Sequence, residues 1–402
     1  MLFALCWRAG KQMEIRLYRD SDKHSWDTYV MSHPDATHCH LSVWKEIIEN
    51  TYHHKTYYLI AERFSHNPSN SINPTNPNNL MNSAMPYALC PMRGSERIAG
   101  ILPLVHINSF LFGNQLVSMP FLNYGGILAE DEKTERALLS EAIRLGQKLK
   151  VGKIEIRHIK PLQWIKEINS SNPKNLMNPL TIRTLFHKVR MVLELPGSSD
   201  ELFKSYNSKL RSQIRRPQKE GMNSIMGGAE LLKDFYKVFS INMRDLGSPV
   251  HSKNLFREIL NHFDQNVKIG IVNYKGQAVA AGIIFCFRNI VEIPWASSLR
   301  KYNQFSPNML LYWSFLEYAC KSGHKYFDFG RSTPEEGTHK FKEQWGAKPT
   351  PLYWHNIVLN GHQIDENDSG KSKFGKAIEC WKKLPLPISN RVGPIIRKYI
   401  SL

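Results

Sequence analysis

The segment KYFDFGRSTPEEGTHKFKEQWGAKPTPLYW, residues 325–354, decides the fold of this chain. Its aromatic run YFDF predicts a β-strand, and Asp328 lies inside that strand. Gly330 frees the backbone directly afterwards, which places Arg331 at the end of the strand. A turn rich in Ser, Thr, Pro and Gly follows, and a second strand closes the segment.

The middle of this segment combines a cation with large aromatic rings and indicates the wall of a pocket. Lys342 lies between Phe341 and Trp345, where partial burial directs its ammonium inward. A fixed cation stabilises the negative charge that acyl transfer develops on a carbonyl oxygen, so Lys342 is a candidate catalytic residue. Trp345 is a candidate for the pocket wall, with simple packing as the alternative. Arg331 either forms a structural ion pair with Asp328 or binds a substrate carboxylate or phosphate.

The composition indicates a folded protein with an anionic partner. The 402 residues suit two domains, and 42% of them are hydrophobic. The net charge of +18 favours nucleic acid, anionic lipid or a phosphate-bearing substrate. Six scattered cysteines without a CxxC pair are typical of reduced thiols in a cytoplasmic protein. No apolar run approaches the length of about 18 residues that a membrane span needs.

The order of predicted elements repeats along the chain. Each half predicts helices, then strands, a helix and a further strand, which indicates a duplicated α/β domain. The expected first domain spans 1–188 and carries Asn- and Pro-rich surface insertions near 65–86 and 169–180. The expected second domain spans 189–361, and residues 362–402 form a basic and apolar tail.

A very basic helix is predicted near the start of the second domain. Residues 204–219 contain six Lys or Arg and no acid. Arg211, Arg215 and Lys219 are spaced by four residues and form one stripe, suited to a phosphate backbone or a pyrophosphate. A solvated helix face is the alternative. Repulsion between like charges at this spacing favours the anion site, while Pro217 leaves the position of Lys219 open.

A second candidate anion site precedes the helix predicted at 307–322. Ser306 is a candidate cap for this helix, and Asn308 follows in its first turn. Arg300 and Lys301 add two cations beside the free N–H groups of the helix start, which suits a phosphate. A helix that is merely capped is the alternative. The corresponding place in the first half is acidic, so only the second half is expected to hold a donor phosphate there.

Other site classes find little support. Five histidines crowd the first half around Cys39, at positions His33, His38, His40, His53 and His54. Their spacing matches no standard zinc site, so no metal is expected. No GxSxG, P-loop or HExxH motif is present. The chain is therefore expected to position two substrates and stabilise charge without a covalent intermediate.

Several motifs together closely resemble those of FemAB-type acyltransferases. They are LPLVHINSFLFGNQLVSMPFLNYGG (102–126), SKLRSQIRRPQKEG (208–221), NMRDLGSPV (242–250), FDFGRS (327–332), FKEQWGAKP (341–349) and WKKLPLPISNRVGPIIRK (381–398). The last of these resembles the FemAB-like proteins associated with exosortase/PEP-CTERM systems, which carry a BioF2-like acetyltransferase domain. Tyr124, in the first motif, is counted among the candidate substrate-binding residues.

The resemblance implies an α/β (α+β) fold with two tandem acetyltransferase-like (GNAT) domains, each a mixed sheet flanked by helices. It implies an N-acyltransferase that moves an acyl or aminoacyl group onto an amine of a cell-envelope or exopolysaccharide precursor. Lys342 matches the family lysine that stabilises the oxyanion or holds a substrate phosphate. The donor is acyl-CoA or aminoacyl-tRNA: the usual acetyl-CoA loop is not visible, and neither is a heptad run for a tRNA-binding arm.

The alternative function is a catalytically inactive module that binds an anionic polysaccharide, lipid or RNA. The sequence has no recognised RNA-binding motif, and DNA is not an expected partner. Apolar and basic residues alternate in the tail over 376–398. They predict either peripheral contact with anionic lipid at the inner membrane or docking onto the second domain.

Overall fold

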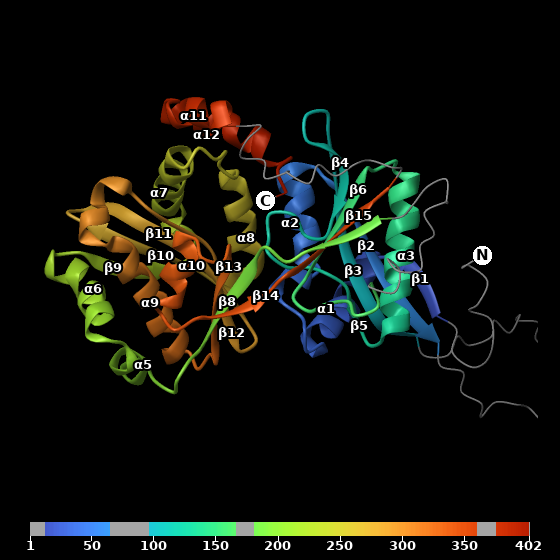
Figure 1. The fold of residues 1–402 in the computed structure, drawn as a ribbon, viewed down its shortest axis with the longest axis horizontal. Helices are drawn as coiled ribbons and strands as arrows, with labels where there is room; N and C mark the ends of the chain where they lie inside the picture. Colours follow the sequence, from blue (N-terminus) through green and yellow to red (C-terminus); the bar gives the residue numbers. More distant parts are fainter. Residues whose placement is uncertain (1–12, 65–95, 166–180, 360–374, 402) are drawn as a thin grey trace, which may run out of the picture.

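The fold consists of two mixed sheets that lie side by side, each flanked by helices (Figure 1). The computed structural model describes residues 13–64, 96–165, 181–359 and 375–401. The insertions expected near 65–86 and 169–180 lie outside these ranges. The arrangement confirms the expected α/β fold class.

The first sheet collects the strands of the first half and one strand from far along the second half. In spatial order these are β1 (Met13–Leu17), β2 (Lys55–Phe64), β3 (Glu96–Ser109), β4 (Gly113–Val117), β6 (Lys153–His158), β15 (Tyr353–Val358) and β7 (Thr181–Leu185), while β5 (Leu128–Ala129) pairs with β3. Its helices are α1 (Lys23–Ser32), α2 (Val43–Tyr52) and α3 (Glu132–Lys148). Helix α3 forms because Asp131 caps its first turn and a stripe including Leu138, Ala142 and Leu145 is buried on one face.

The second sheet belongs to the second half. In spatial order its strands are β14 (Lys348–Pro351), β8 (Val189–Glu194), β13 (Tyr326–Ser332), β12 (Ile290–Ser298), β11 (Gln277–Phe287), β10 (Val267–Tyr274) and β9 (Asn223–Gly227). Its helices are α5 (Ser199–Ser205), α6 (Ser208–Lys219), α7 (Leu232–Asp245), α8 (Lys253–Phe263), α9 (Pro307–Lys321) and α10 (Gly337–Glu343). The tail contributes α11 (Gly375–Lys382) and α12 (Leu386–Arg397).

Strand β15 departs from the domain ranges expected from the sequence. Its residues, 353–358, fall within the expected second domain at 189–361, yet they pair antiparallel with both β6 and β7 of the first sheet. Most of the strand is buried, so the first sheet supplies both its hydrogen bonds and its apolar surroundings. The chain therefore crosses back, and the two halves are interlocked.

Each sheet contains one parallel strand pair that diverges after a short contact. In the second sheet, β12 and β13 pair over residues 290–292 and 326–328, and then separate although both strands continue. In the first sheet, β4 and β6 pair over 115–117 and 153–155. The other strand pairs among the described residues are antiparallel. The halves thus share one architecture, with a gap beyond each parallel pair.

In the first half the chain itself spans this gap. Arg157 on β6 is completely buried, and its guanidinium donates to the carbonyl oxygens of Met119 at 3.2 Å and Leu122 at 2.6 Å. The Arg157 backbone N–H also donates to Ser118 Oγ at 2.9 Å. These bonds tie the segment after β4 to β6. In the second half, by contrast, a cavity is found beside the diverging strands.

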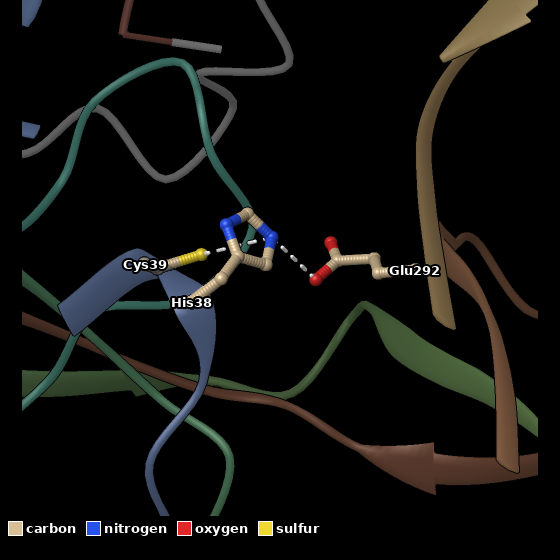
Figure 2. A group of neighbouring side chains, drawn as sticks. All are labelled: His38, Cys39 and Glu292. Carbon is tan, nitrogen blue, oxygen red and sulfur yellow. Dashed lines mark hydrogen bonds and ion pairs between the residues drawn. The ribbon is translucent and has the colours of Figure 1, made fainter. Parts of the chain in front are cut away.

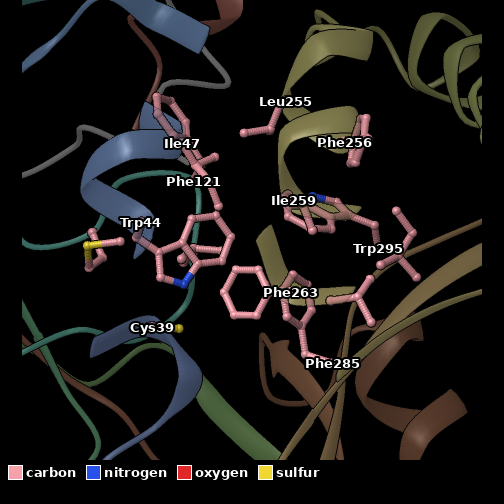
Figure 3. Packing of buried hydrophobic residues seen from close by; sticks show 14 of the residues in the cluster. Cys39, Trp44, Ile47, Phe121, Leu255, Phe256, Ile259, Phe263, Phe285 and Trp295 are labelled. Carbon is pink, nitrogen blue, oxygen red and sulfur yellow. The ribbon is translucent and has the colours of Figure 1, made fainter. Parts of the chain in front are cut away.

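A shared aromatic core holds the two halves together (Figure 3). Trp44 on α2 and Phe121 belong to the first half, whereas Phe263 on α8, Phe285 on β11 and Trp295 on β12 belong to the second. The Trp44 and Phe263 rings lie 5.3 Å apart between centroids, and the Phe263 ring meets Phe285 edge-on at 5.0 Å. Burial of such rings stabilises the contact by roughly 1.5–3 kcal/mol each. Groups at the interface are therefore held in fixed positions.

The tail docks against both halves. Arg397 donates from Nε to His251 Nε2 at 3.1 Å, and the Ser401 carbonyl oxygen accepts from the Phe121 N–H at 2.7 Å. Gly393 faces Val250 so closely that a Cβ would lie 3.0 Å from its backbone nitrogen. One of the two expectations for the tail, docking, is thus observed, and it reaches the first half as well. Within the described ranges, none of the helices has both the length and the hydrophobicity of a transmembrane span.

Candidate active site between the two halves

Asp328 is the centre of a buried polar network between the halves. Its Oδ2 accepts from Arg190 Nε at 2.6 Å and from the Tyr124 hydroxyl at 2.9 Å, while Oδ1 accepts from the Gly330 N–H at 2.8 Å. Tyr124 comes from the first half and Arg190 from β8 of the second. Burial raises the pKa of the Asp328 carboxyl, against the opposing effect of Arg190.

The predicted ion pair between Arg331 and Asp328 is wrong. Arg190 takes the place of Arg331, because β8 pairs with β13 directly beside the carboxylate. Arg331 instead stacks its guanidinium over the Trp354 ring at 4.9 Å, as Arg157 does at 4.5 Å. Burial, together with nearby Arg157, lowers the pKa of Arg331 to about 10. A half-buried cation beside a second cation favours an anionic ligand.

Glu292 is a second buried carboxylate, and the sequence analysis missed it. It lies on β12 as the strand partner of Asp328 on β13. Its Oε2 lies 2.9 Å from His38 Nε2, and its Oε1 accepts from Asn123 Nδ2 at a longer 3.4 Å (Figure 2). Burial alone would lower the pKa of His38, but Cys39 and Glu292 outweigh it and raise this pKa to about 10. His38 and Glu292 therefore form an ion pair across the interface.

The same cluster has the donor types of a metal site (Figure 2). Cys39 Sγ lies 3.8 Å from His38 Nε2, and the ligand atoms of His38, Cys39 and Glu292 lie within 4.8 Å of one another. Zinc binds this set of residue types. The expectation of no metal rested on histidine spacing, which could not reveal a ligand from the other half. To bind a metal, His38 must release its Nε2 proton and Cys39 must ionise.

Lys342 on α10 is buried beside this network. Its Nζ donates to the carbonyl oxygens of Gly330 at 3.2 Å and Arg331 at 2.8 Å. Gly330 has a φ of +71°, which turns the backbone at the end of β13. Burial lowers the pKa of Lys342 to about 8, and Arg331 contributes to this shift, while Asp328 opposes it. Lys342 is therefore a cation with two neutral acceptors and no carboxylate bonded to it among the described residues.

A cavity of about 260 Å³ lies beside Lys342. It is lined by Asn242, Ala296, Ser297, Ser298, Asn308, Leu311, Tyr312, Gly337, Thr338, Phe341 and Lys342. These residues come from α7, the far end of β12, the first turns of α9, and α10. The cavity is thus reached where β12 has left β13. It brings Lys342 and Asn308 to one place, as two of the sequence-predicted site residues.

Ser306 does not cap α9 in the way the sequence suggested. It occupies the N-cap position with a left-handed backbone, φ +57° and ψ 45°, and its side chain makes no capping hydrogen bond to a described residue. A left-handed serine cannot present its hydroxyl as an extended N-cap does. The first-turn N–H groups of α9 thus lack this side-chain acceptor, in the same turn where Asn308 faces the cavity. Such N–H groups favour an anion.

The remaining predicted residues lie outside this cavity. Arg300 and Lys301 are exposed in the short helix before α9. Trp345 is completely buried and packs on Tyr206, with ring centroids 5.7 Å apart. It lines a different groove, of about 840 Å³, which borders α5 and β8. Its placement fits packing better than contact with a substrate in the cavity. Tyr124, by contrast, belongs to the Asp328 network.

The basic stripe on α6 does not meet Lys342. Figure 1 places α6 on the outer side of the second sheet, away from the interface. Arg211 donates to the carbonyl oxygens of Lys204 and Tyr206, and Arg215 stacks over Phe203 at 4.9 Å. The helix continues through its internal proline to Lys219. Arg211 therefore supports local structure, while the stripe still presents an exposed basic surface.

The acetyltransferase (GNAT) domain family matches residues 204–343 of this chain, the part that contains the cavity. The crystal structure of FemX superposes with a TM-score of 0.57 at 13% identity, covering 86% of this chain and 98% of that one. A tandem GNAT protein from the clavulanic acid biosynthesis pathway gives a TM-score of 0.50 at 8% identity, covering 88% and 100%. No curated protein sequence matches significantly. The fold is therefore that of tandem GNAT and FemX-like proteins.

Proposed function

We propose that the protein is an N-acyltransferase that transfers an acyl or aminoacyl group to an amine. The observation that carries this proposal is the position of Lys342. Its buried ammonium, bonded only to neutral carbonyls among the described residues, lines the cavity between β12 and the start of α9. A cation in this position stabilises an oxyanion that forms during acyl transfer.

In the proposed mechanism the acyl donor lies in the cavity, with a phosphate at the first-turn N–H groups of α9. The amine attacks the acyl carbonyl, and Lys342 stabilises the oxygen that becomes negative. The attacking nitrogen must lose a proton. Glu292 is the better acceptor, since one of its oxygens is held only by the 3.4 Å contact with Asn123, whereas Asp328 already accepts three shorter hydrogen bonds. No covalent intermediate is needed.

Two donors are consistent with this arrangement. The family match over residues 204–343 supports an acyl-CoA. The exposed stripe on α6 and the net charge of +18 support aminoacyl-tRNA as a second candidate. Both donors carry phosphate, so the α9 site does not separate them. We take acyl-CoA as the first candidate because the cavity lies within the matched region.

For the acceptor we propose a cell-envelope or exopolysaccharide precursor with a free amine. The support is the resemblance of FDFGRS, FKEQWGAKP and the tail motif to FemAB-like proteins of exosortase/PEP-CTERM systems. The cations Arg331 and Arg157, which share the Trp354 ring, are the proposed contact for a phosphate or carboxylate of this acceptor. The corresponding location is cytoplasmic, where such precursors and both donors are available.

A ligand-binding experiment with the purified full chain tests the enzyme proposal. A donor that occupies the cavity should raise the melting temperature by mass action. We expect a shift with at least one acyl-CoA, and a smaller shift in Lys342→Met than in Lys340→Met, which removes an exposed lysine from the same helix. Stabilisation by charged tRNA alone would select the other donor. If neither donor shifts the protein at low salt, a catalytically inactive module for an anionic polysaccharide, lipid or RNA becomes the better assignment.

A further inference from the structure

Helix α12 presents an apolar face that its docking leaves uncovered. Ile388, Val392 and Ile395 are spaced by four and three residues, so they share one face, and their exposed fractions are 47%, 37% and 60%. On the opposite face, Gly393 and Arg397 are buried against the second half. The exposed face therefore belongs to a firmly held helix.

The turn of the β3–β4 hairpin is a second apolar projection. Phe110 is 102% exposed and Leu111 is 79% exposed. The turn is ordered, because Ser109 Oγ accepts from the backbone N–H groups of Leu111 at 3.3 Å and Phe112 at 3.2 Å. An aromatic and an aliphatic side chain are thus held away from the sheet without covering.

These two projections share an edge of the molecule and a positive surrounding. Figure 1 shows α12 and the β3–β4 turn at the same edge, at the top of the view. Residues 375–401 carry six Lys or Arg and one acid, Glu379, which already pairs with Lys382. At the base of the hairpin, Asn114 donates to the Lys150 carbonyl oxygen, which brings the exposed basic end of α3 beside the turn.

From this combination we propose that the protein docks peripherally on an anionic lipid bilayer. The apolar face of α12 and the hairpin turn enter the headgroup region together, while the surrounding Lys and Arg contact lipid phosphates. A negative bilayer complements both the apolar and the charged features. A second copy of this chain would instead bring two positive surfaces together, and a nucleic acid would leave the apolar residues exposed.

Vesicle flotation with the purified full chain tests this proposal. We expect binding to vesicles containing phosphatidylglycerol, weaker binding in high salt, and little binding to pure phosphatidylcholine. Ile395→Asp and Phe110→Asp should each weaken binding about tenfold or more, since a carboxylate replaces an inserted apolar group and adds repulsion. Ile225→Asp is the matched control, because Ile225 is 40% exposed on β9, outside both projections; it should bind like the unaltered protein.

Three results would overturn the proposal. One is failure of the unaltered protein to bind phosphatidylglycerol vesicles at low salt. Another is equal binding by Ile395→Asp, Phe110→Asp and the Ile225→Asp control. The third is a dimer in light scattering that Ile395→Asp abolishes, which would assign the apolar face to a second copy of this chain. Because these variants lie outside the cavity, acyl transfer to a water-soluble amine should be unchanged, so this test is independent of the proposed enzyme activity.

Discussion

Glu292 on β12 and Asp328 on β13 are strand partners at the last parallel pair before the two strands diverge. Two buried carboxylates are thus adjacent at the point from which the cavity extends. Each is stabilised from the first half, Glu292 by His38 and Asp328 by Tyr124. The site therefore depends on both halves, although the cavity is lined by residues of the second alone.

Replacement of Lys342 by methionine should remove most of the activity. The methionine keeps the packing volume but cannot stabilise an oxyanion, and removal of such an interaction lowers kcat by about 10²–10³-fold. Steady-state kinetics with the donor identified by thermal shift provide the measurement. The control Lys340→Met, on the exposed face of α10, should retain full activity. Equal activity of both variants would remove Lys342 from the mechanism.

The pH dependence should show opposite signs for activity and stability. Burial lowers the pKa of Lys342 from 10.5 to about 8, so activity that requires its ammonium should fall as pH rises through about 8. The buried charge costs stability at neutral pH, and this cost is relieved between about pH 8 and 10.5, where the unfolded chain binds more protons. Thermal unfolding of Lys342→Met should lack this relief. A profile identical to that of the unaltered protein would contradict the assignment.

Replacement of His38 by glutamine should destabilise the interface. It leaves Glu292 buried without its charged partner, which costs about 3–5 kcal/mol. The His38 pKa is raised to about 10, so its contribution is complete below about pH 6.5 and is lost as pH rises through about 10. Denaturant unfolding of His38→Gln, Glu292→Gln and the double variant measures the coupling. Additive effects would show that the two residues do not interact.

Zinc provides a separate test of the cluster at His38. If His38, Cys39 and Glu292 hold a metal, zinc should raise the melting temperature of the unaltered protein but not of Cys39→Ser. Cys320→Ser, which alters another buried thiol, is the control. If zinc shifts all three proteins equally, the cluster acts as an ion pair.

The basic stripe on α6 should matter for one donor only. Arg215→Gln with Lys219→Gln should leave transfer from acyl-CoA unchanged, because α6 lies away from the cavity. With aminoacyl-tRNA, binding should weaken, and the slope of its salt dependence should drop by about one unit for each RNA phosphate that the variant no longer neutralises. Lys233→Gln, an exposed change on α7, is the control for charge. A loss of acyl-CoA transfer in the stripe variant would place the stripe in the active site.

Local patterns in the sequence were enough to determine the fold class and several elements. The aromatic run around Asp328 is indeed a strand, and the predicted helix at 307–322 is α9 at 307–321. The inward position of Lys342 also followed from its aromatic neighbours. These features depend on residues close together in the chain, because strand and helix periodicity and capping are local effects. The acid in the run VEIPWA, residues 291–296, is the same kind of signal, and it could have identified Glu292.

Only the tertiary structure decided which charges meet. Asp328 pairs with Arg190 rather than with Arg331, three residues away, and Glu292 pairs with a histidine 254 positions earlier in the chain. It also decided that β15 completes the first sheet. A buried charge must find a partner to offset its loss of water, and the packing of the two sheets determines which partner is within reach. No local spacing encodes that choice, so the interface site became visible only once the halves were assembled.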